Sequence, residues 1–379
     1  MKIAFLHIKH SGTGGNEKYL NDASFYLADQ GHEVTIICRR HEAAHHKNIN
    51  FVTLKPFALG PAHRSWAFAK AADKYLKQNH FDVVIGLGKT YSQDILRLGA
   101  GLIESYREAA HKYSRSPLQI ALGRDWLKNK IELNLERRAF EKGNYKHIIA
   151  NSQMVADDVM AKYNVPKDKI SVIYNGVDVT RFTPDNREKY RASIRNEFNI
   201  AMDDKVLLYL GTNYGLKGLD RALNALKEVV EKNKKVKLLV VGYGKRVDEF
   251  KANAASLGLK DHVIFAGGRR DPEAFYAAAD IFVLPTRYDP FANATLEALA
   301  SGLPVITTRQ NGGHELLLDS ECARVLKAPD NSAEMVEAIN HFLSSKVLAE
   351  ITEKAVELAM QHQIKSKMRQ LSMLVEQTS

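Results

Sequence analysis

Short apolar segments alternate with helical patterns along this 379-residue chain, and this alternation constrains its fold more than any other feature. In the first half, the segments typical of buried strands are residues 3–8, 34–38, 51–53, 81–86, 148–150 and 170–173. Strands separated by helices favour a parallel, doubly wound α/β sheet. Such a sheet binds ligands at the carboxyl ends of its strands.

The second half repeats the alternation. Strand patterns occur at residues 206–210, 237–241, 263–266, 281–284 and 305–307, with helical patterns at 219–230, 247–257, 272–279 and 295–300. Residues 181–185 separate the halves with a proline-containing linker, and the chain is helical by pattern from residue 332. A chain of this length is too long for a single hydrophobic core of ordinary size, so two domains are expected.

The composition is typical of a globular protein, with 45% hydrophobic and 26% charged residues. No apolar run approaches the roughly 20 residues of a membrane span, and the first residues read as a strand rather than a signal peptide. Cys38 and Cys322 lie far apart beside apolar segments. They are expected to be reduced thiols of a cytoplasmic protein rather than a disulfide or metal site.

The net charge of +10 is concentrated in the first half of the chain. Residues 1–170 hold 26 Lys and Arg against 17 Asp and Glu, whereas residues 171–379 hold 28 against 27. This excess fits an anionic partner, such as a membrane surface or a lipid-linked acceptor, or a solvated basic face. Residues 104–147 interleave basic, aromatic and aliphatic side chains, which is typical of a membrane-contact segment or of a surface helix. No nucleic-acid motif occurs, so no nucleic-acid partner is expected.

Two carboxylates flank a predicted helix start in residues 286–305. Asp289 lies in a loop after a strand, and Glu297 lies just over one turn into the next helix. The N–H groups at a helix N-terminus attract anions. This arrangement suits a ligand with a phosphate in the middle and hydroxyls at both ends, such as a nucleotide sugar.

Glycine-rich turns follow the first strand of each half. In the turn at residues 12–15, Glu17 interrupts the Gly-x-Gly-x-x-Gly spacing, which argues against a dinucleotide cofactor. The turn at residues 211–218 places Lys217, flanked by Gly218, at the start of a helix. The sequence has no Asp-x-Asp motif, and His45-His46 has no third ligand at suitable spacing, so no metal site is expected.

Taken in order, these motifs resemble those of retaining glycosyltransferases of the GT-B fold, family 4. The resemblance extends along nearly the whole chain and rests on Gly14-Gly15-Asn16-Glu17, Gly31-His32-Glu33-Val34, Asn151-Ser152, Asn175-Gly176-Val177-Asp178, Lys217-Gly218, Asp289 to Glu297, Gly302-Leu303-Pro304-Val305 and Gly312-Gly313-His314-Glu315. Within the family, residues 215–221 and the basic segment after residue 100 look like those of bacterial lipopolysaccharide-core glucosyltransferases.

The resemblance implies two Rossmann-like doubly wound domains that face a cleft. Residues 1–180 would bind the acceptor, residues 181–350 the donor, and residues 351–379 would form a helical segment crossing back to the first domain. The implied reaction moves a hexose, with retention, from a nucleotide-diphosphate sugar to a glycan or lipid-linked acceptor. A UDP-sugar donor is favoured, with no cofactor or metal, in cell-envelope polysaccharide or lipopolysaccharide synthesis at the inner face of the membrane.

The resemblance also assigns roles to residues. The expected catalytic residues are Lys217, Asp289 and Glu297: Lys217 would neutralise the diphosphate, and Glu297 would accept hydrogen bonds from ribose hydroxyls. The expected donor-binding residues are Gly14, Gly15, Lys217, Asp289, Phe291, Ala292, Asn293, Glu297 and Glu315.

The sequence departs from the family pattern in three places. Asp289 stands where the family usually has Glu, and Leu216 and Thr212 stand where a second basic residue is frequent. Residues 99–104 contain no counterpart of the family's histidine, so no catalytic residue is assigned to the first domain. A sugar-nucleotide epimerase of the same fold and a non-catalytic nucleotide-sugar-binding protein remain the alternatives.

Overall fold

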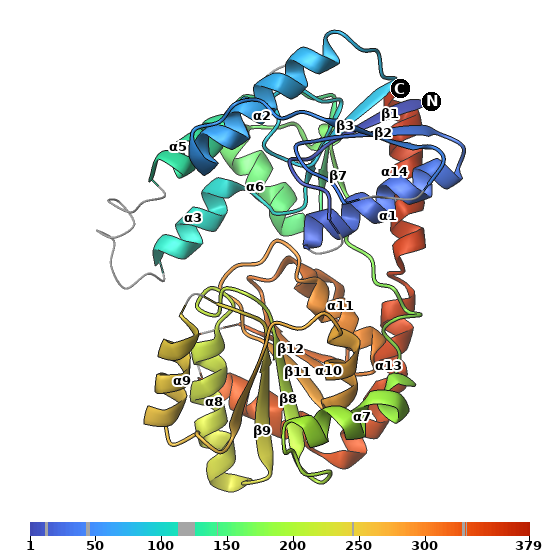
Figure 1. Ribbon diagram of the computed structural model, residues 1–379. Coiled ribbons are helices and arrows are strands. Elements are labelled where there is room, and N and C mark those ends of the chain that lie inside the picture. The colour runs from blue at the N-terminus through green and yellow to red at the C-terminus, as the bar shows by residue number, and fades with distance from the viewer. Residues whose placement is uncertain are drawn as a thin grey trace. The chain divides into compact units, whose positions relative to one another are not determined.

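The computed structural model describes residues 1–11, 14–42, 46–112, 126–141, 143–244, 246–327, 330 and 332–379. The chain forms two compact units (Figure 1). Unit 1 comprises Met1–Asn175 and Ile364–Ser379, and unit 2 comprises Gly176–Gln363. No helix in the described ranges is long and apolar enough to cross a membrane.

Unit 1 contains a seven-stranded, all-parallel sheet with strand order β3-β2-β1-β4-β5-β6-β7. Its strands are β1 (Lys2–Leu6), β2 (Glu33–Cys38), β3 (Ile49–Thr53), β4 (Val83–Gly86), β5 (Ile95–Leu98), β6 (His147–Ala150) and β7 (Ile170–Val172). Its helices are α1 (Gly15–Asp29), α2 (Gly60–Leu76), α3 (Ile103–Lys112), α5 (Trp126–Ala139), α6 (Gln153–Tyr163) and α14 (Ile364–Thr378). The direction of strand addition reverses between β1 and β4.

The core of unit 1 explains why its strands are continuously apolar. On one face of the sheet, Phe5 of β1 and Ile85 of β4 are buried with Leu20 of α1 and Leu371 of α14. On the other face, neighbouring residues of β1 and β2 pack against Phe68 of α2. A parallel strand covered on both faces has apolar residues at successive positions, and each buried side chain contributes about 1.5–3 kcal/mol. Helix α14 therefore belongs to unit 1, where it packs beside α1 (Figure 1).

Unit 2 contains a second all-parallel sheet, with six strands in the order β10-β9-β8-β11-β12-β13. Its strands are β8 (Lys205–Leu210), β9 (Val236–Val241), β10 (Val263–Gly267), β11 (Ile281–Leu284), β12 (Val305–Thr308) and β13 (Ala323–Leu326). Its α-helices are α7 (Asn186–Glu197), α8 (Leu219–Lys232), α9 (Val247–Ser256), α10 (Pro272–Ala278), α11 (Asn293–Ala300), α12 (Ser332–Phe342) and α13 (Ser345–Met360). The expectation of two doubly wound parallel sheets is confirmed.

A buried ion-pair network attaches α7 to the sheet of unit 2. Arg195 is fully buried and donates to Asp280 Oδ2 at 2.9 Å, while Arg191 donates to Asp280 Oδ1 at 2.7 Å. The same carboxylate accepts a hydrogen bond from the backbone N–H of Val206 at the start of β8, at 2.8 Å. Asp280 thus joins α7, β8 and the entry to β11.

Several elements of both units have no clear sequence pattern. Strands β5 and β13 each carry an arginine, Arg97 and Arg324, which interrupts the apolar run expected of a strand. Helices α2 and α7 were also not expected. The sequence places boundaries at 180/181 and 350/351, whereas the units divide after Asn175 and after Gln363. Helix α13 remains in unit 2 because it packs on α11.

Candidate functional site

The strand order of unit 2 reverses between the neighbouring strands β8 and β11. At such a point, the loops leaving the two strands run to opposite sides and open a crevice at the carboxyl edge of the sheet. Lys217 lies in the loop after β8, and Asp289 lies in the loop after β11. The topology therefore places both residues at the position where a doubly wound sheet binds ligands.

Lys217 and Asp289 form an ion pair across this switch point, in which the ammonium group of Lys217 donates to Asp289 Oδ2. Their side chains are only 20% and 11% exposed. Burial lowers the pKa of Lys217 to about 7, whereas the adjacent carboxylate acts in the opposite direction. The switch point thus contains a partly desolvated cation whose charge a bound anion would stabilise.

The loop that carries Lys217 is held tightly against the loop after β11. Gly218 has φ +75°, and a Cβ atom there would lie 2.0 Å from the carbonyl oxygen of Pro285, so only glycine fits without displacement. Arg287 donates to both carboxylate oxygens of Asp220, each at 2.6 Å, and to the carbonyl of Gly215 at 2.6 Å. These contacts fix Lys217 from both sides. No local sequence pattern indicates this role of Arg287.

The loop of Asp289 is fixed to the loop that follows β12. The N–H of Asp289 donates to the carbonyl of Gln310, and the carbonyl of Asp289 accepts from the N–H of Gly312, both at 2.8 Å. The N–H of Phe291 donates to Asp289 Oδ1 at 3.2 Å. The carboxylate thus orders its own loop while it pairs with Lys217.

Asn311 is the polar centre of this part of the site. It is fully buried, and its Oδ1 accepts hydrogen bonds from the N–H groups of Ala292 and Gly313, both at 3.0 Å. Its Nδ2 donates to the hydroxyls of Thr295 and Thr307, at 3.0 and 3.1 Å. Asn311 is not among the predicted site residues, although an asparagine before two glycines signals a turn.

Glu297 lies on α11, and a buried tyrosine orients it. Tyr276 Oη donates to Glu297 Oε2 at 3.1 Å and lies 3.2 Å from the carbonyl oxygen of Ala294. Burial, and then the neighbouring carboxylate of Glu297, raise the pKa of Tyr276, so this hydroxyl remains a donor. Glu315 lies in the 3₁₀-helix Gly312–Leu316, on the loop after β12.

The residues expected at the donor site of unit 2 therefore lie on three neighbouring loops and their helices. Lys217 and Asp289 are in direct contact. The N–H groups of Phe291 and Ala292 have acceptors in Asp289 and Asn311, so these two groups order the loop. Asn293 begins α11.

Gly14 and Gly15 lie in unit 1, at the start of α1. Gly14 has φ +109°, a backbone conformation that favours glycine, and a Cβ atom on it would lie 2.3 Å from the Glu17 carboxylate, which would have to move. Gly12 and Thr13 lie outside the described residues. Beside this turn, a cavity of about 280 Å³ opens at the carboxyl ends of β1, β4 and β5. It is lined by His7, Glu17, Lys89, Arg97 and Gly99, among others.

Arg97 connects the glycine turn to Asn175, the last residue of unit 1 before the chain enters unit 2. It is 2% exposed, and it donates to Asn16 Oδ1 at 3.2 Å and to Asn175 Oδ1 at 2.7 Å. Its guanidinium lies 3.4 Å from the ring centroid of Tyr19. Arg97 is therefore a positioning residue, which sequence analysis overlooked together with the strand that carries it.

Other sequence-based expectations concern metal binding, cysteines and the basic segment. Within the described residues, no group of three His, Cys, Asp or Glu side chains is placed to hold a metal ion. Cys38 and Cys322 are buried free thiols, and burial raises the pKa of Cys38 to about 11. Of the segment 104–147, residues 113–125 and 142 lie outside the described part of the chain, as does His45 of the histidine pair.

Comparison with known proteins links these features to one family. Residues 13–181 match the family described as Glycosyltransferase Family 4, and residues 191–360 match Glycosyl transferases group 1. The chain is 24% identical over 348 residues to the lipopolysaccharide glucosyltransferase WaaG of Escherichia coli (strain K12), covering 92% of this chain and 91% of that protein.

Solved structures show the same fold. The crystal structure of WaaG, described as a glycosyltransferase involved in lipopolysaccharide biosynthesis, has a TM-score of 0.82 and 23% identity, covering 98% of this chain and 99% of that one. Anabaena HepE in complex with UDP and glucose has a TM-score of 0.74 and 20% identity, covering 99% of each chain. With matches to both family descriptions along the chain and two doubly wound sheets, this protein belongs to the family 4 (group 1) glycosyltransferases of the GT-B fold.

Proposed function

We propose that the chain transfers a hexose from a UDP-sugar to a glycan or lipid-linked acceptor, with retention of the anomeric configuration and without a metal ion. The observation that carries this proposal is the contact of Lys217 with Asp289 at the switch point between β8 and β11. The relative in Escherichia coli is a lipopolysaccharide glucosyltransferase, which supports an acceptor in the cell envelope. The solved complexes of HepE with UDP and with UDP-glucose support the choice of donor.

Lys217 is the group that stabilises the negative charge of the departing diphosphate. Negative charge grows on the phosphate oxygens as the bond to the anomeric carbon breaks, and a desolvated ammonium group interacts with it more strongly than a hydrated one does. Because the ammonium group of Lys217 pairs with Asp289, the diphosphate would either share this group with the carboxylate or take its place. Removing one such donor typically costs on the order of 10²–10³ in rate.

Glu297 and Asp289 would hold the two ends of the donor. The Tyr276 hydroxyl orients the Glu297 carboxylate, which would accept hydrogen bonds from ribose hydroxyls. Asp289 would contact the hexose, and it is one methylene shorter than the glutamate usual in the family. Glu315 on the next loop is a further candidate contact, and Gly14 and Gly15 remain predicted donor contacts from unit 1.

Retention without a protein nucleophile requires a front-side reaction. The acceptor hydroxyl oxygen forms the new bond to the anomeric carbon while the bond from that carbon to the diphosphate oxygen breaks. The acceptor proton passes to the departing phosphate oxygen. In this scheme the side chains bind, orient and stabilise charge, and none of them becomes covalently attached to the sugar.

The test is a donor screen with UDP-, GDP- and ADP-sugars, with and without a glycan acceptor and with EDTA present. We expect release of UDP that acceptor accelerates and EDTA leaves unchanged. Lys217→Ala and Glu297→Ala should each reduce transfer by about 10²-fold or more. Lys232→Ala, on the exposed end of the adjacent helix α8, serves as the matched control.

Two outcomes would contradict the proposal. Near-normal transfer by both Lys217→Ala and Glu297→Ala would refute the site. Conversion of the donor sugar into its epimer, without acceptor and without release of nucleotide, would instead identify an epimerase.

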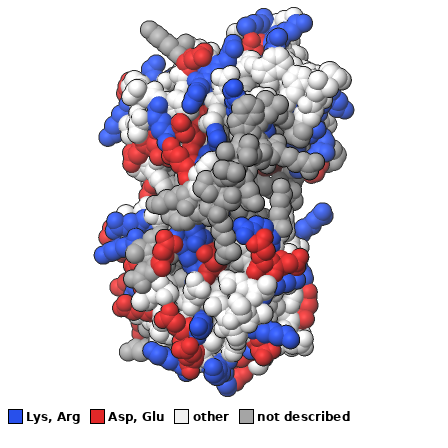
Figure 2. Space-filling model, turned by 90° about the vertical axis from the view of Figure 1, so that its left-hand side faces the viewer, with Lys and Arg blue, Asp and Glu red and all other residues white. Residues whose placement is uncertain are grey.

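Peripheral contact with an anionic membrane through unit 1 is part of the same proposal. Its support is the excess of 26 basic over 17 acidic residues in residues 1–170. On the face shown in Figure 2, however, Lys and Arg side chains are interspersed with Asp and Glu over both units. Flotation with vesicles containing anionic lipid tests the contact, and the absence of salt-sensitive binding would refute it.

A further inference from the structure

We propose that a cavity between α2 and α5 of unit 1 binds a neutral sugar unit of an extended acceptor glycan. The cavity has a volume of about 470 Å³, within the range of small-molecule sites. The inference rests on the proposed function, because it takes the acceptor to be a glycan. It adds a site at which no step of the transfer reaction takes place.

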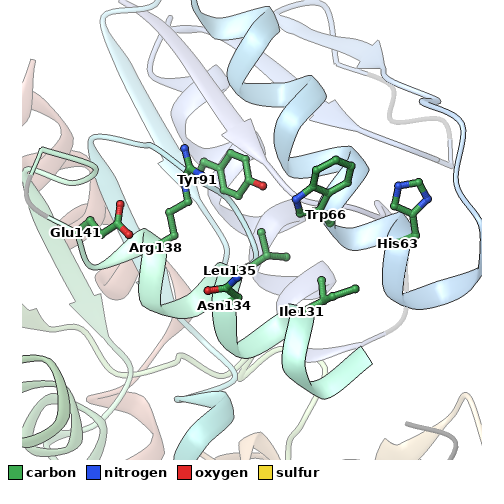
Figure 3. A pocket seen from close by; sticks show the side chains of 8 residues that line it. All are labelled: His63, Trp66, Tyr91, Ile131, Asn134, Leu135, Arg138 and Glu141. Carbon is green, nitrogen blue, oxygen red and sulfur yellow. The ribbon is translucent and has the colours of Figure 1, made fainter. Parts of the chain in front are cut away.

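Aromatic side chains form one wall of this cavity. His63 and Trp66 project from α2, and Tyr91 projects from the loop after β4 (Figure 3). The rings of His63 and Trp66 are stacked, with centroids 5.3 Å apart and planes inclined by 23°. The Lys70 ammonium group also lies 5.2 Å from the Trp66 ring centroid, and yet Trp66 remains 38% exposed. A large indole ring that is partly packed and still accessible is available to a ligand.

Polar side chains of α5 and of the segment just after it form the facing wall. Asn134, Arg138 and Glu141 line it, and the Arg138 guanidinium lies 4.2 Å from the ring centroid of Tyr91 (Figure 3). Within the described part of the chain, the side chains of Asn134 and Glu141 and the indole N–H of Trp66 have no hydrogen-bond partner. These groups supply both donors and acceptors toward the cavity.

This combination matches the chemistry of a pyranose ring. Such a ring presents C–H groups on its faces and hydroxyls around its edge. Trp66 can pack against the C–H face, while Asn134, Arg138 and Glu141 can bond to the hydroxyls. An acyl chain would desolvate these three polar groups without replacing their hydrogen bonds, and an anionic group would meet the carboxylate of Glu141. A neutral sugar is therefore the favoured occupant.

The cavity is distinct from the one at the switch point of unit 1. Helix α5 presents Glu136 and Ala139 to the cavity at the carboxyl ends of β1, β4 and β5. It presents Asn134 and Arg138 to the cavity beside α2. The loop after β4 contributes Lys89 to the first cavity and Tyr91 to the second. Two sites that share a helix and a loop suit successive units of one glycan.

Binding can be measured directly, because the chain contains only two tryptophans, Trp66 and Trp126. In the full-length Trp126→Phe variant, Trp66 is the sole tryptophan and reports on the cavity. The probes are lipid-free core oligosaccharide from a bacterial lipopolysaccharide and maltotetraose. We expect a saturable change in Trp66 fluorescence with at least one of them, and Asn134→Ala should weaken this binding about tenfold.

Kinetics distinguish a binding site from a structural role. Trp66→Ala should raise KM for an oligosaccharide acceptor about tenfold, with kcat changed by less than about twofold, because the interaction is the same in the ground and transition states. KM for the donor should not change. Phe57→Ala is the matched control, because Phe57 is 78% exposed and does not line the cavity.

Two results would overturn the inference. One is unchanged Trp66 fluorescence with every saccharide, together with a wild-type acceptor KM in Trp66→Ala and Asn134→Ala. The other is a fluorescence response to short-chain detergent that the saccharides do not compete away, which would identify a lipid site. Release of UDP in the absence of acceptor tests the proposed function without involving this cavity. Failure of the proposed function can therefore be distinguished from failure of the cavity to bind a sugar.

Discussion

Replacing Asn311 with alanine tests how the loops of unit 2 are held together. The change removes four hydrogen bonds from a side chain that is fully buried. The hydroxyl oxygens of Thr295 and Thr307 each lose one accepted bond, and Thr307 keeps the bond that it donates to the carbonyl of Leu284. The buried N–H groups of Ala292 and Gly313, by contrast, lose their acceptor. An unsatisfied buried donor costs about 1–3 kcal/mol, so two of them predict a loss of about 2–6 kcal/mol in the free energy of unfolding.

Urea unfolding followed by circular dichroism measures this loss. Both tryptophans lie in unit 1, so tryptophan fluorescence records that unit separately. We expect the dichroism transition of Asn311→Ala to move to lower urea. KM for the donor should also rise, because Asn311 orders the loop that carries Asp289. Asn186→Ala, which removes a single exposed bond to the carbonyl of Arg181, should change stability by less than about 0.5 kcal/mol. A loss below about 1 kcal/mol in Asn311→Ala would refute the reasoning.

Two further predictions concern charged groups. Burial lowers the pKa of Lys217 to about 7, below the roughly 10.4 of a free lysine. Between these two values Lys217 is protonated in the unfolded chain but not in the folded one, so it makes the free energy of unfolding rise with pH. Over the same range the folded protein loses the charge of Lys217, so its affinity for an anionic donor falls. In the Lys217→Arg variant the side chain stays charged, so the normalised pH profile of kcat/KM from pH 6 to 9 should lack the alkaline decline of the native enzyme. Identical profiles for the two proteins would count against Lys217 as the titrating group. Asp280→Asn should lower the free energy of unfolding by about 3–5 kcal/mol, because it leaves the buried Arg195 without its carboxylate. Thermal unfolding measures this loss, and Asp261→Asn, at an exposed position, is the control. Equal melting midpoints for the two variants would disprove the prediction.

Much of the fold and part of the site could be predicted from local sequence. Runs of apolar residues identify buried strands, since a strand covered on both faces has no polar side, and β1, β2 and β8 follow this rule. The glycine-flanked Lys217 and the pair Asp289 and Glu297 were found in the same way, because helix starts and tight turns depend on neighbouring residues. The rule failed at β5, where the buried Arg97 breaks the apolar pattern.

Only the tertiary structure decided which of these residues meet. Lys217 and Asp289 are 72 positions apart, and they come into contact because the strand order reverses between β8 and β11. That reversal depends on the side of the sheet on which each connecting helix packs, which no local pattern specifies. The supporting residues Arg287, Asn311 and Tyr276 were missed for the same reason. Their function arises from hydrogen bonds to distant loops, and such bonds exist only once the sheet has assembled.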